Sequence, residues 1–465
     1  MDKKYHSTVS RRDFLKILGL GGLGLGASAI ATPVIHDLDE MMASSEADFK
    51  RSWYVKEVDK PTVEIDWKMM QRFDEHLVMW YAGLRNALGP EEYDRVFRTQ
   101  QENRLKWIKE GRPGYTLRDD ALHNASHWAP VSFLGPQTSQ TPEQVGVPRW
   151  EGTHEENARM IRAYLKLHGA AQVGFVELYS ESTEKLIYSH DTPEGFPAFN
   201  RGKMLVFLDG DRPFETEDTR IIPKKARWVI VYTIRMSDVL MRYTPTHIGL
   251  APTMVGYELK SLIQGQLQNF LRSLGYMCLG ESSFYNSLGT HVGFGVLAGL
   301  GETSRVMHLM TPEYGVRQRV FMVITDLPLA PGKPIDFGAM QFCRTCKKCA
   351  DFCPVKAIPH ATDPEWDVYG SYSSPGVRIW RRNEPVCNAY MLQAGFLEGC
   401  SICFGVCPLS KGNSKTFYND FMKATISNTP VLNRLFRNMD DFLGYGIKGD
   451  PERFWELDLP PFGWD

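Results

Sequence analysis

Residues 342–358 read FCRTCKKCADFCPVKAI, and this stretch decides how the rest of the chain is interpreted. It holds four of the nine cysteines of the chain, and a proline follows the last of them. The spacing Cys-x2-Cys-x2-Cys-x3-Cys-Pro is the run with which bacterial ferredoxins hold iron–sulfur clusters. The run consists of Cys343, Cys346, Cys349, Cys353 and Pro354.

A second run, VCNAYMLQAGFLEGCSICFGVCP, occupies residues 386–408 and brings the number of such cysteines to eight, enough for two 4Fe–4S clusters. Its first cysteine is set back by twelve residues from its second. In two-cluster ferredoxins the fourth cysteine of each run binds the other cluster. We therefore expect one cluster on Cys343, Cys346, Cys349 and Cys407. We expect the other on Cys353, Cys387, Cys400 and Cys403.

Two other uses of these cysteines are open from the sequence. Structural zinc would take four cysteines in two pairs, and disulfides are common in exported proteins. The ninth cysteine, Cys278, lies in the apolar segment LGYMCLG, and we expect it to be an inert buried thiol.

The N-terminus looks like an export signal. SRRDFLK, residues 10–16, resembles the twin-arginine (Tat) signal, and an apolar run of fifteen residues, 17–31, follows it. That run is shorter than the about 20 residues that span a membrane, and it ends in a small-x-small cleavage pattern at Ala29 and Ala31. We expect residues 1–31 to be cleaved. An amphipathic helix with a chance pair of arginines is the alternative.

Composition and charge exclude some partners. The net charge of −2 gives no electrostatic basis for binding nucleic acid. At 465 residues we expect several structural units: an N-terminal region at 32–150, a core at 151–335, a cluster domain at 336–412 and a C-terminal extension at 413–465. Six tryptophans precede residue 160, and some of them could line an apolar cavity. They are Trp53, Trp67, Trp80, Trp107, Trp128 and Trp150.

The core region predicts an α+β fold. A helix should begin at Thr153, with Glu156 completing a capping box, and should stop at Gly169. Further strands are expected at 171–178, 226–236 and 318–326. A long amphipathic helix should start near Pro252 and run to about Leu274. The polar segment 180–226 is predicted to be an insertion in this core.

The usual nucleotide fingerprints are missing from the sequence. There is no GxGxxG after a strand, and the glycine-rich stretch 293–302 lacks the Lys-Ser/Thr of a phosphate loop. Close backbone approach to a flat ligand fits that stretch better. A flavin is not excluded at this point.

The whole chain resembles the reductive dehalogenases of the chloroethene type, the corrinoid iron–sulfur enzymes of organohalide respiration. SRRDFLK, HGAAQVGFVEL, AGLGETSR, TPEYGVRQRVFMVITDLPLAPGKPID and VLNRLFRNMDDFLGYG carry the resemblance together with the paired cysteine runs. The resemblance implies a nitroreductase-like core that binds base-off cobalamin as the acceptor of the cluster electrons. No DxHxxG motif is present to supply a histidine to cobalt, which agrees with that family.

The resemblance also implies three catalytic residues. Tyr257 in TMVGY would be the proton donor, Asn286 its neighbour, and Arg319 the basic residue, with Arg317 as a competitor for that role. A phenol has an unperturbed pKa near 10, and a nearby guanidinium stabilises the phenolate. The ordinary alternatives are a core aromatic for Tyr257 and a turn residue for Asn286. For Arg319 the alternative is an ion pair with Asp326 or Glu313.

The expected reaction replaces a carbon-bound halogen by hydrogen, using two electrons and one proton at Co(I). The substrate would be a small chlorinated alkene or alkane. The resemblance further implies a small integral-membrane anchor protein, a quinol-linked electron donor, the Tat translocase as exporter, and a place on the outer face of the cytoplasmic membrane. Two alternatives are a relative of epoxyqueuosine reductase and an exported electron-transfer subunit without its own catalytic centre.

Overall fold

The computed structural model describes residues 54–115, 132–137, 139, 141–145, 148–192, 201–282, 286–396, 399–411, 417–442 and 446–464. The predicted signal at 1–31 lies outside the described residues, as do Trp53 and Trp128. In the described part, no helix is both long and apolar enough to cross a membrane.

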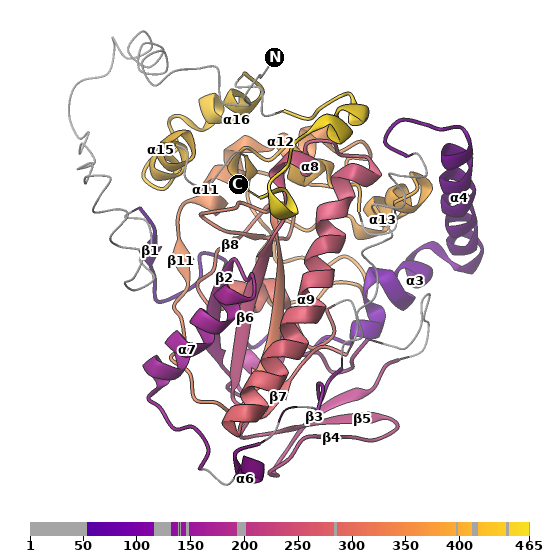
Figure 1. Ribbon diagram of the computed structural model, residues 1–465. Helices are drawn as coiled ribbons and strands as arrows, with labels where there is room; N and C mark the ends of the chain where they lie inside the picture. Colours follow the sequence, from indigo (N-terminus) through magenta and orange to yellow (C-terminus); the bar gives the residue numbers. More distant parts are fainter. Residues whose placement is uncertain are drawn as a thin grey trace, which may run out of the picture.

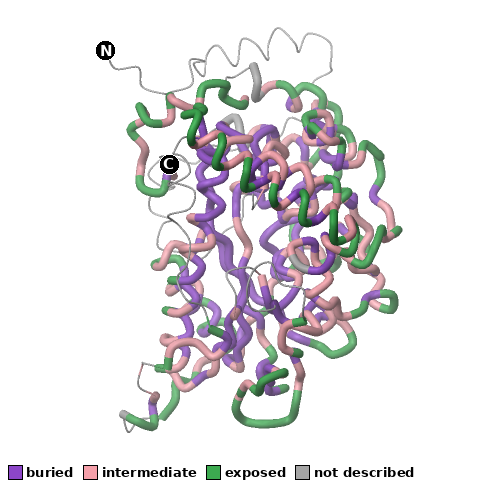
Figure 2. Tube along the Cα trace, turned by 90° about the vertical axis from the view of Figure 1, so that its right-hand side faces the viewer, coloured by how far each residue is buried: buried purple, intermediate pink, exposed green. Residues whose placement is uncertain are grey.

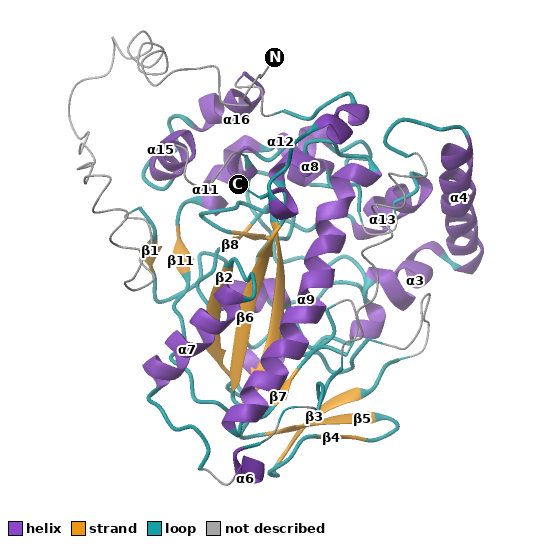
Figure 3. Cartoon of the chain, viewed as in Figure 1, coloured by secondary structure: helices purple, strands orange, loops and turns teal. Residues whose placement is uncertain are grey.

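A four-stranded antiparallel sheet forms the centre of the molecule (Figure 3). Its order is β2 (Gln172–Glu177), β6 (Trp228–Arg235), β10 (Gln318–Thr325) and β7 (Cys278–Leu279). Almost every residue of β6 is buried, because both faces of the sheet are covered. The three expected strands and the α+β class are thereby confirmed, and Cys278 is a buried strand residue as predicted.

Helices cover the two faces of this sheet. α7 (His154–Leu167) and α9 (His247–Leu274) pack on one face, where alternate residues such as Phe175 and Ile230 meet Leu267 of α9. α10 (His291–Leu297) packs on the opposite face. Figure 2 shows the buried residues running through the middle of the molecule along these layers.

The expected start of α7 is confirmed, and that of α9 is corrected. Thr153 and Glu156 form both halves of the capping box, and Gly169 has a φ of 95° just beyond the helix. α9, however, begins at His247, because the side chain of Thr246 accepts the N–H of Gly249 and caps it there. Pro252 therefore lies inside the second turn rather than at the first position.

The segment predicted as a polar insertion, 180–226, forms a small sheet of its own. β3 (Met204–Leu208) pairs in parallel with β5 (Thr219–Pro223), and β4 (Phe214–Glu215) pairs with β5 antiparallel. A 3₁₀ turn, η4 (Thr183–Leu186), precedes this sheet.

The cysteine-containing segments form short helices at the end of the sheet where α9 begins (Figure 1). They are α11 (Ala339–Cys346), α12 (Lys348–Phe352), α13 (Glu384–Gln393), α14 (Ile402–Gly405) and η5 (Pro408–Ser410). C-terminal helices α15 (Phe417–Ile426) and α16 (Asn433–Phe442) pack on α11.

The N-terminal region packs on the same end of the molecule. α4 (Pro90–Lys109) contacts α13 through a small apolar cluster that contains Tyr93, Val96 and Leu392. β1 (Lys56–Glu57) pairs with β11 (Ile335–Asp336) just before α11. The domain boundaries expected from the sequence stay a prediction.

The remaining short elements connect these layers. They are η2 (Glu75–Leu77), η3 (Met79–Gly83), α3 (Leu84–Leu88), α6 (Pro142–Val145), α8 (Asp238–Met241), β8 (Glu302–Thr303), β9 (Leu309–Met310), η6 (Pro451–Glu456) and η7 (Pro461–Gly463).

Candidate active site and cluster sites

A cavity of about 340 Å³ lies between the sheet and the cysteine-containing helices. Tyr257 of α9, Arg319 of β10 and Asn286 of the loop before α10 all line it. Three residues that are far apart in the sequence and were expected to act together are therefore brought to one cavity. Their catalytic roles stay predictions.

Arg319 and Tyr257 lie against each other. The guanidinium carbon of Arg319 is 5.5 Å from the centre of the Tyr257 ring, and Nη2 of Arg319 donates to Oγ1 of Thr253 at 2.8 Å. Gly256 makes this approach possible, because a Cβ there would stand 3.1 Å from Cγ of Arg319. A permanent cation thus sits beside the phenol, and a nearby cation stabilises a phenolate.

The competitor Arg317 does not line the cavity. It is 2% exposed and pairs with Asp238, 3.3 Å from Nη1 to Oδ1. Strand alternation does not place it with Arg319, because Arg317 lies in the turn before β10 and donates its N–H to the carbonyl of Tyr314. Arg319 itself forms no ion pair with a carboxylate of the described residues, Asp326 and Glu313 included.

Several buried polar atoms on this cavity lack a hydrogen-bond partner among the described residues. They include Oδ1 of Asn286, Nε of Arg319 and Oδ1 of Asn388. A buried polar group without a partner costs about 1–3 kcal/mol, so such atoms in a cavity wall indicate a place for a ligand. Gly399 of the opposite wall leaves further room, since a Cβ there would meet no atom closer than 3.8 Å.

Several cavity residues were not found from the sequence. No motif surrounds them, and only the fold brings them to the wall. Burial lowers the pKa of His308 far below its usual range, and the neighbouring Arg382 and Arg319 lower it further, so its imidazole is neutral. Of the six early tryptophans, Trp80 lines the cavity. Other residues that were missed include Glu75, Tyr188, His291, Met307 and Arg382.

The first cysteine run surrounds a separate small cavity. Cys343, Cys346, Cys349 and Cys407 line it, and Cys403 also reaches it. Burial, and to a smaller extent the thiol of Cys407, raises the pKa of Cys346. The thiol would therefore stay protonated until a metal ion binds it.

The buried side chain of Arg305 fixes the backbone of the first run through hydrogen bonds to carbonyl groups. Its guanidinium donates to the carbonyl of Cys343 at 2.7 and 3.1 Å and to those of Pro359 and Ala361 at 2.6 and 2.8 Å. It also lies over the ring of Trp380, 4.5 Å from the ring centre. Burial lowers the pKa of Arg305, and the nearby thiols oppose that shift.

The second run lies on the active-site cavity itself. Cys387, Cys400 and Cys403 line that cavity, and Cys353 is among the thiols that affect the pKa of all three, after burial, which raises each. The two groups of thiols agree with the crossed assignment expected from the spacing. Which cysteine binds which cluster stays a prediction.

An ion pair accompanies the second run. Nε and Nη2 of Arg382 donate to the two carboxylate oxygens of Glu384, each at 3.0 Å. Burial opposes the charge of Arg382, but Glu384 and the thiols of Cys387 and Cys403 outweigh it and raise the pKa of Arg382. A fixed positive charge therefore stands at the cavity beside these thiols.

In the part of the chain that the structure describes, no three His, Cys, Asp or Glu side chains converge on one metal ion. A 4Fe–4S cube needs no such convergence, because each thiolate binds a different iron atom.

A buried group of charges lies behind the cavity wall. Oε2 of Glu281 forms an ion pair with Nζ of Lys260, 2.9 Å away, and Oε1 is paired with His291. Although burial opposes it, His291 and Lys260 together lower the pKa of Glu281. Lys260 lies one helical turn after Tyr257 on α9, so the charged group is built into the same helix as the phenol.

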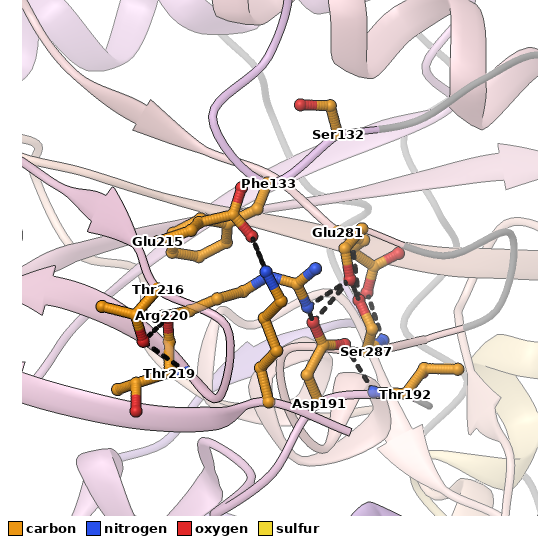
Figure 4. Close-up of polar contacts among 12 residues, drawn as sticks. Ser132, Phe133, Asp191, Thr192, Glu215, Thr216, Thr219, Arg220, Glu281 and Ser287 are labelled. Carbon is orange, nitrogen blue, oxygen red and sulfur yellow. Dashed lines mark hydrogen bonds and ion pairs between the residues drawn. The ribbon is translucent and has the colours of Figure 1, made fainter. Parts of the chain in front are cut away.

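Polar residues continue from this group toward the surface (Figure 4). Ser287 donates its N–H to Glu281 at 3.3 Å, and its Oγ accepts the N–H of Ser282 at 3.1 Å. Arg220 lies beyond them, paired with Asp191 and, at 2.6 Å, with Glu215.

Two groups of cluster-type cysteines adjoin a cavity that a tyrosine and an arginine also line, an arrangement suited to an oxidoreductase. Comparison with known proteins identifies the family. Residues 50–133 and 125–329 match the family described as reductive dehalogenase subunit, and residues 342–410 match the 4Fe-4S double cluster binding domain. The chain therefore belongs to the reductive dehalogenase family, whose members act on carbon–halogen bonds.

Two relatives match over nearly their whole length. Trichloroethene reductive dehalogenase of Dehalococcoides mccartyi is 27% identical over 99% of this chain and 98% of its own. Tetrachloroethene reductive dehalogenase of Sulfurospirillum multivorans is 29% identical over 100% of this chain and 96% of its own. Epoxyqueuosine reductase of Bacillus subtilis is 30% identical over only 25% of this chain.

Solved structures share the fold. The catabolic reductive dehalogenase NpRdhA has a TM-score of 0.59 and 23% identity, covering 87% of this chain. The chain spans about half of that longer protein, 51%. Another structure, with a TM-score of 0.59 and 22% identity, is described as suggesting a mechanism for B12-dependent dehalogenation.

Proposed function

We propose that this chain replaces a carbon-bound halogen of a small chlorinated alkene or alkane by hydrogen, with a corrinoid in the cavity and two 4Fe–4S clusters on the eight cysteines. The observation that carries the proposal is the shared cavity. Tyr257, Asn286 and Arg319 line it together with Cys387, Cys400 and Cys403. A proton donor and an electron supply thus meet at one place.

The cavity suits a large polar cofactor. Partnerless atoms of Asn286 and Arg319 face it, and Gly399 leaves its wall open. Phe404 and the segment 399–401 would hold the corrinoid on the side of the second cluster. Bound there, a reduced corrinoid would supply the two electrons that cleave a carbon–halogen bond.

The side chains of this protein would supply the proton and the charge. Tyr257 would protonate the carbon that loses the halogen. Arg319, over the Tyr257 ring, would stabilise the phenolate left behind and favour transfer from a weak acid. The amide of Asn286 would orient the substrate or the phenol. Arg319 and Arg382 already carry positive charges on this cavity wall. His308 is neutral in its buried position and adds no third one.

The Tyr257→Phe holoenzyme tests this proposal. Positioned proton transfer contributes about 10²–10⁴-fold to rates, so we expect a loss of that size with cluster and corrinoid content unchanged. The matched control is Tyr164→Phe, whose ring stacks on Phe270 away from the cavity. Rates on chlorinated ethenes, ethanes and phenols with a reduced viologen would define the substrate. Full activity of Tyr257→Phe would remove Tyr257 from the mechanism, and purified protein with clusters but no cobalt would overturn the corrinoid.

We further propose export by the Tat route and a place on the outer face of the cytoplasmic membrane. SRRDFLK at residues 10–16 supports this route, since it carries folded proteins with cofactors inserted. A small integral-membrane protein would anchor the chain and a quinol-linked chain would feed it. Membrane fractionation of the tagged chain, with and without its neighbouring genes, tests the anchor. Membrane association without those genes would contradict it.

A further inference from the structure

Glu75 is a buried carboxyl on the active-site cavity that the proposed mechanism does not use. It is the first residue of η2 and is 3% exposed. Oε2 accepts a hydrogen bond from Oγ1 of Thr192 at 2.6 Å. No lysine or arginine of the described residues forms an ion pair with it.

The groups around Glu75 favour its neutral form. Burial raises the pKa of Glu75 well above its usual range, and the neighbouring Glu281 and Asp74 raise it further, against the Thr192 hydrogen bond and Lys260, which lower it. Lys260 is itself paired with Glu281, and Glu281 also holds His291. Tyr188, a half-buried residue on this wall, has a pKa that burial raises. These surroundings favour the protonated carboxylic acid of Glu75 over the carboxylate.

The reaction needs such a proton at every turnover. One halide and one C–H bond are formed from R–X, two electrons and one proton. If Tyr257 donates that proton, its phenolate must recover one before the next substrate reacts. Glu75 and Tyr257 line the same cavity.

Glu75 belongs to a connected group of hydrogen bonds and ion pairs that reaches the partly exposed carboxylate of Glu215. Thr192 donates its N–H to Oδ1 of Asp191 at 2.5 Å, and Ser282 donates Oγ–H to Oδ2 of Asp191 at 2.6 Å. Arg220 joins Asp191 to Glu215, whose side chain is 26% exposed (Figure 4). Buried polar groups are costly unless they are satisfied, so a chain of them between cavity and surface needs a reason.

We propose that Glu75 is the proton-relay residue of this site: its carboxylic acid reprotonates the Tyr257 phenolate after each turnover and is then reloaded from solvent. In this step an O–H bond of Glu75 breaks and an O–H bond of Tyr257 forms, and no electrons move. The inference rests on the proposed function, in which Tyr257 protonates the product carbon.

The first experiment compares first and later turnovers in the reduced Glu75→Gln holoenzyme mixed rapidly with trichloroethene. Tyr257 starts protonated, so we expect one product per active site at the wild-type rate. Later turnovers should then be about 10–100-fold slower. Glu75→Asp should recover part of the steady rate. Glu184→Gln, a carboxyl away from the cavity whose pKa is also raised by burial, is the matched control and should keep the wild-type rate.

Steady-state turnover of Glu75→Gln at the wild-type rate, or an equal slowing of the first turnover, would overturn the relay while leaving the dehalogenase function standing. Wild-type holoenzyme that releases no halide from any substrate would overturn the proposed function and the relay with it.

A second measurement does not depend on turnover. The infrared spectrum of the wild-type holoenzyme at pH 7 should contain the carbonyl stretch of a protonated carboxylic acid that is missing in Glu75→Gln and shifts in D₂O. Spectra that are identical in this region would show that Glu75 carries no proton and would overturn the proposal. Equal cluster and corrinoid content in both proteins excludes misfolding as the cause of a difference.

Discussion

The two cysteine runs have the same local backbone but opposite surroundings. In each run the residue after the second cysteine has a left-handed backbone. It is Lys347 in the first run and Ser401 in the second, each with a φ of 53°, and a short helix follows it. The first run is enclosed by Arg305 and the C-terminal helices. The second lies open to the active-site cavity beside Arg382.

This difference gives the two clusters different places in one path. Cys403 lines both the small cavity of the first run and the active-site cavity. The second cluster would therefore stand between the first cluster and the reacting groups. Equal spacing in a sequence fixes what a run can bind, whereas the packing around it decides what lies next to the bound cluster.

The largest expected effect, and the sharpest test of the difference between the two runs, is the removal of one cysteine from each run in separate variants. Both Cys403→Ala and Cys346→Ala should lose the iron of one cluster and lower viologen-dependent activity on the order of 100-fold. With a small, strong reductant such as titanium(III) citrate, Cys346→Ala should recover far more activity, because its second cluster still borders the cavity. Iron content and electron paramagnetic resonance check cluster loss. Equal recovery by both variants would contradict the order of the clusters.

Glu302 should give the first run a pH dependence in stability. Its Oε1 accepts the N–H groups of Phe337 and Ala339 at the start of α11, each at 2.9 Å, and Thr62 donates to Oε2 at 2.8 Å. Burial, followed by the charge of Asp336, raises the pKa of Glu302 from 4.5 to about 7.

Because the folded state binds this proton more tightly, the contribution of Glu302 is complete below pH 4.5 and is lost as the pH rises to about 7. A shift of this size corresponds to about 3 kcal/mol. The difference in unfolding free energy between wild type and Glu302→Gln should fall by that amount across this window, as measured by denaturant unfolding of the holoprotein. A difference that stays constant with pH would show that the carboxyl remains ionised in the fold.

The smallest expected effect is on the unfolding free energy, and it should be equal for the left-handed residues of the two runs. A non-glycine residue in the left-handed region costs roughly 1 kcal/mol, so Lys347→Gly and Ser401→Gly should each raise the unfolding free energy by about that amount. Thermal unfolding of the two holoproteins, with iron content as the control, measures this. Stabilisation in one run and loss in the other would mean that the runs are not held alike.

Local pattern predicted the elements whose causes are local. The capping box at Thr153 and the strands β2, β6 and β10 follow from neighbouring residues and from alternation. The predicted start of α9 was wrong. We placed it near Pro252 because a proline is common at the first helical position, but Thr246, six residues earlier, caps the helix. The small sheet β3–β5 was missed because its polar and apolar residues give no clean alternation.

The active site divides in the same way. The eight cysteines and Tyr257, Asn286 and Arg319 were named from motifs, and the structure brings the latter three to one cavity. Glu75, His308 and Arg382 were not named, because no motif surrounds them and each reaches the wall from a different part of the chain. The alternation of side chains along a strand could not decide between Arg317 and Arg319 as the cavity residue, because only the structure shows that β10 begins after Arg317.

The sequence by itself determined the chemical groups available to this protein. It contains the cysteine spacing for two clusters and the tyrosine and arginine that we propose take part in proton transfer. It also determined the family to which the chain belongs. Spacing can do this because ligand geometry within a run is local. Only the tertiary structure decided which cysteine run borders the cavity and which carboxyl is buried on the same cavity as the phenol. Those properties depend on burial and on charges contributed by distant segments, and no short stretch of sequence contains them.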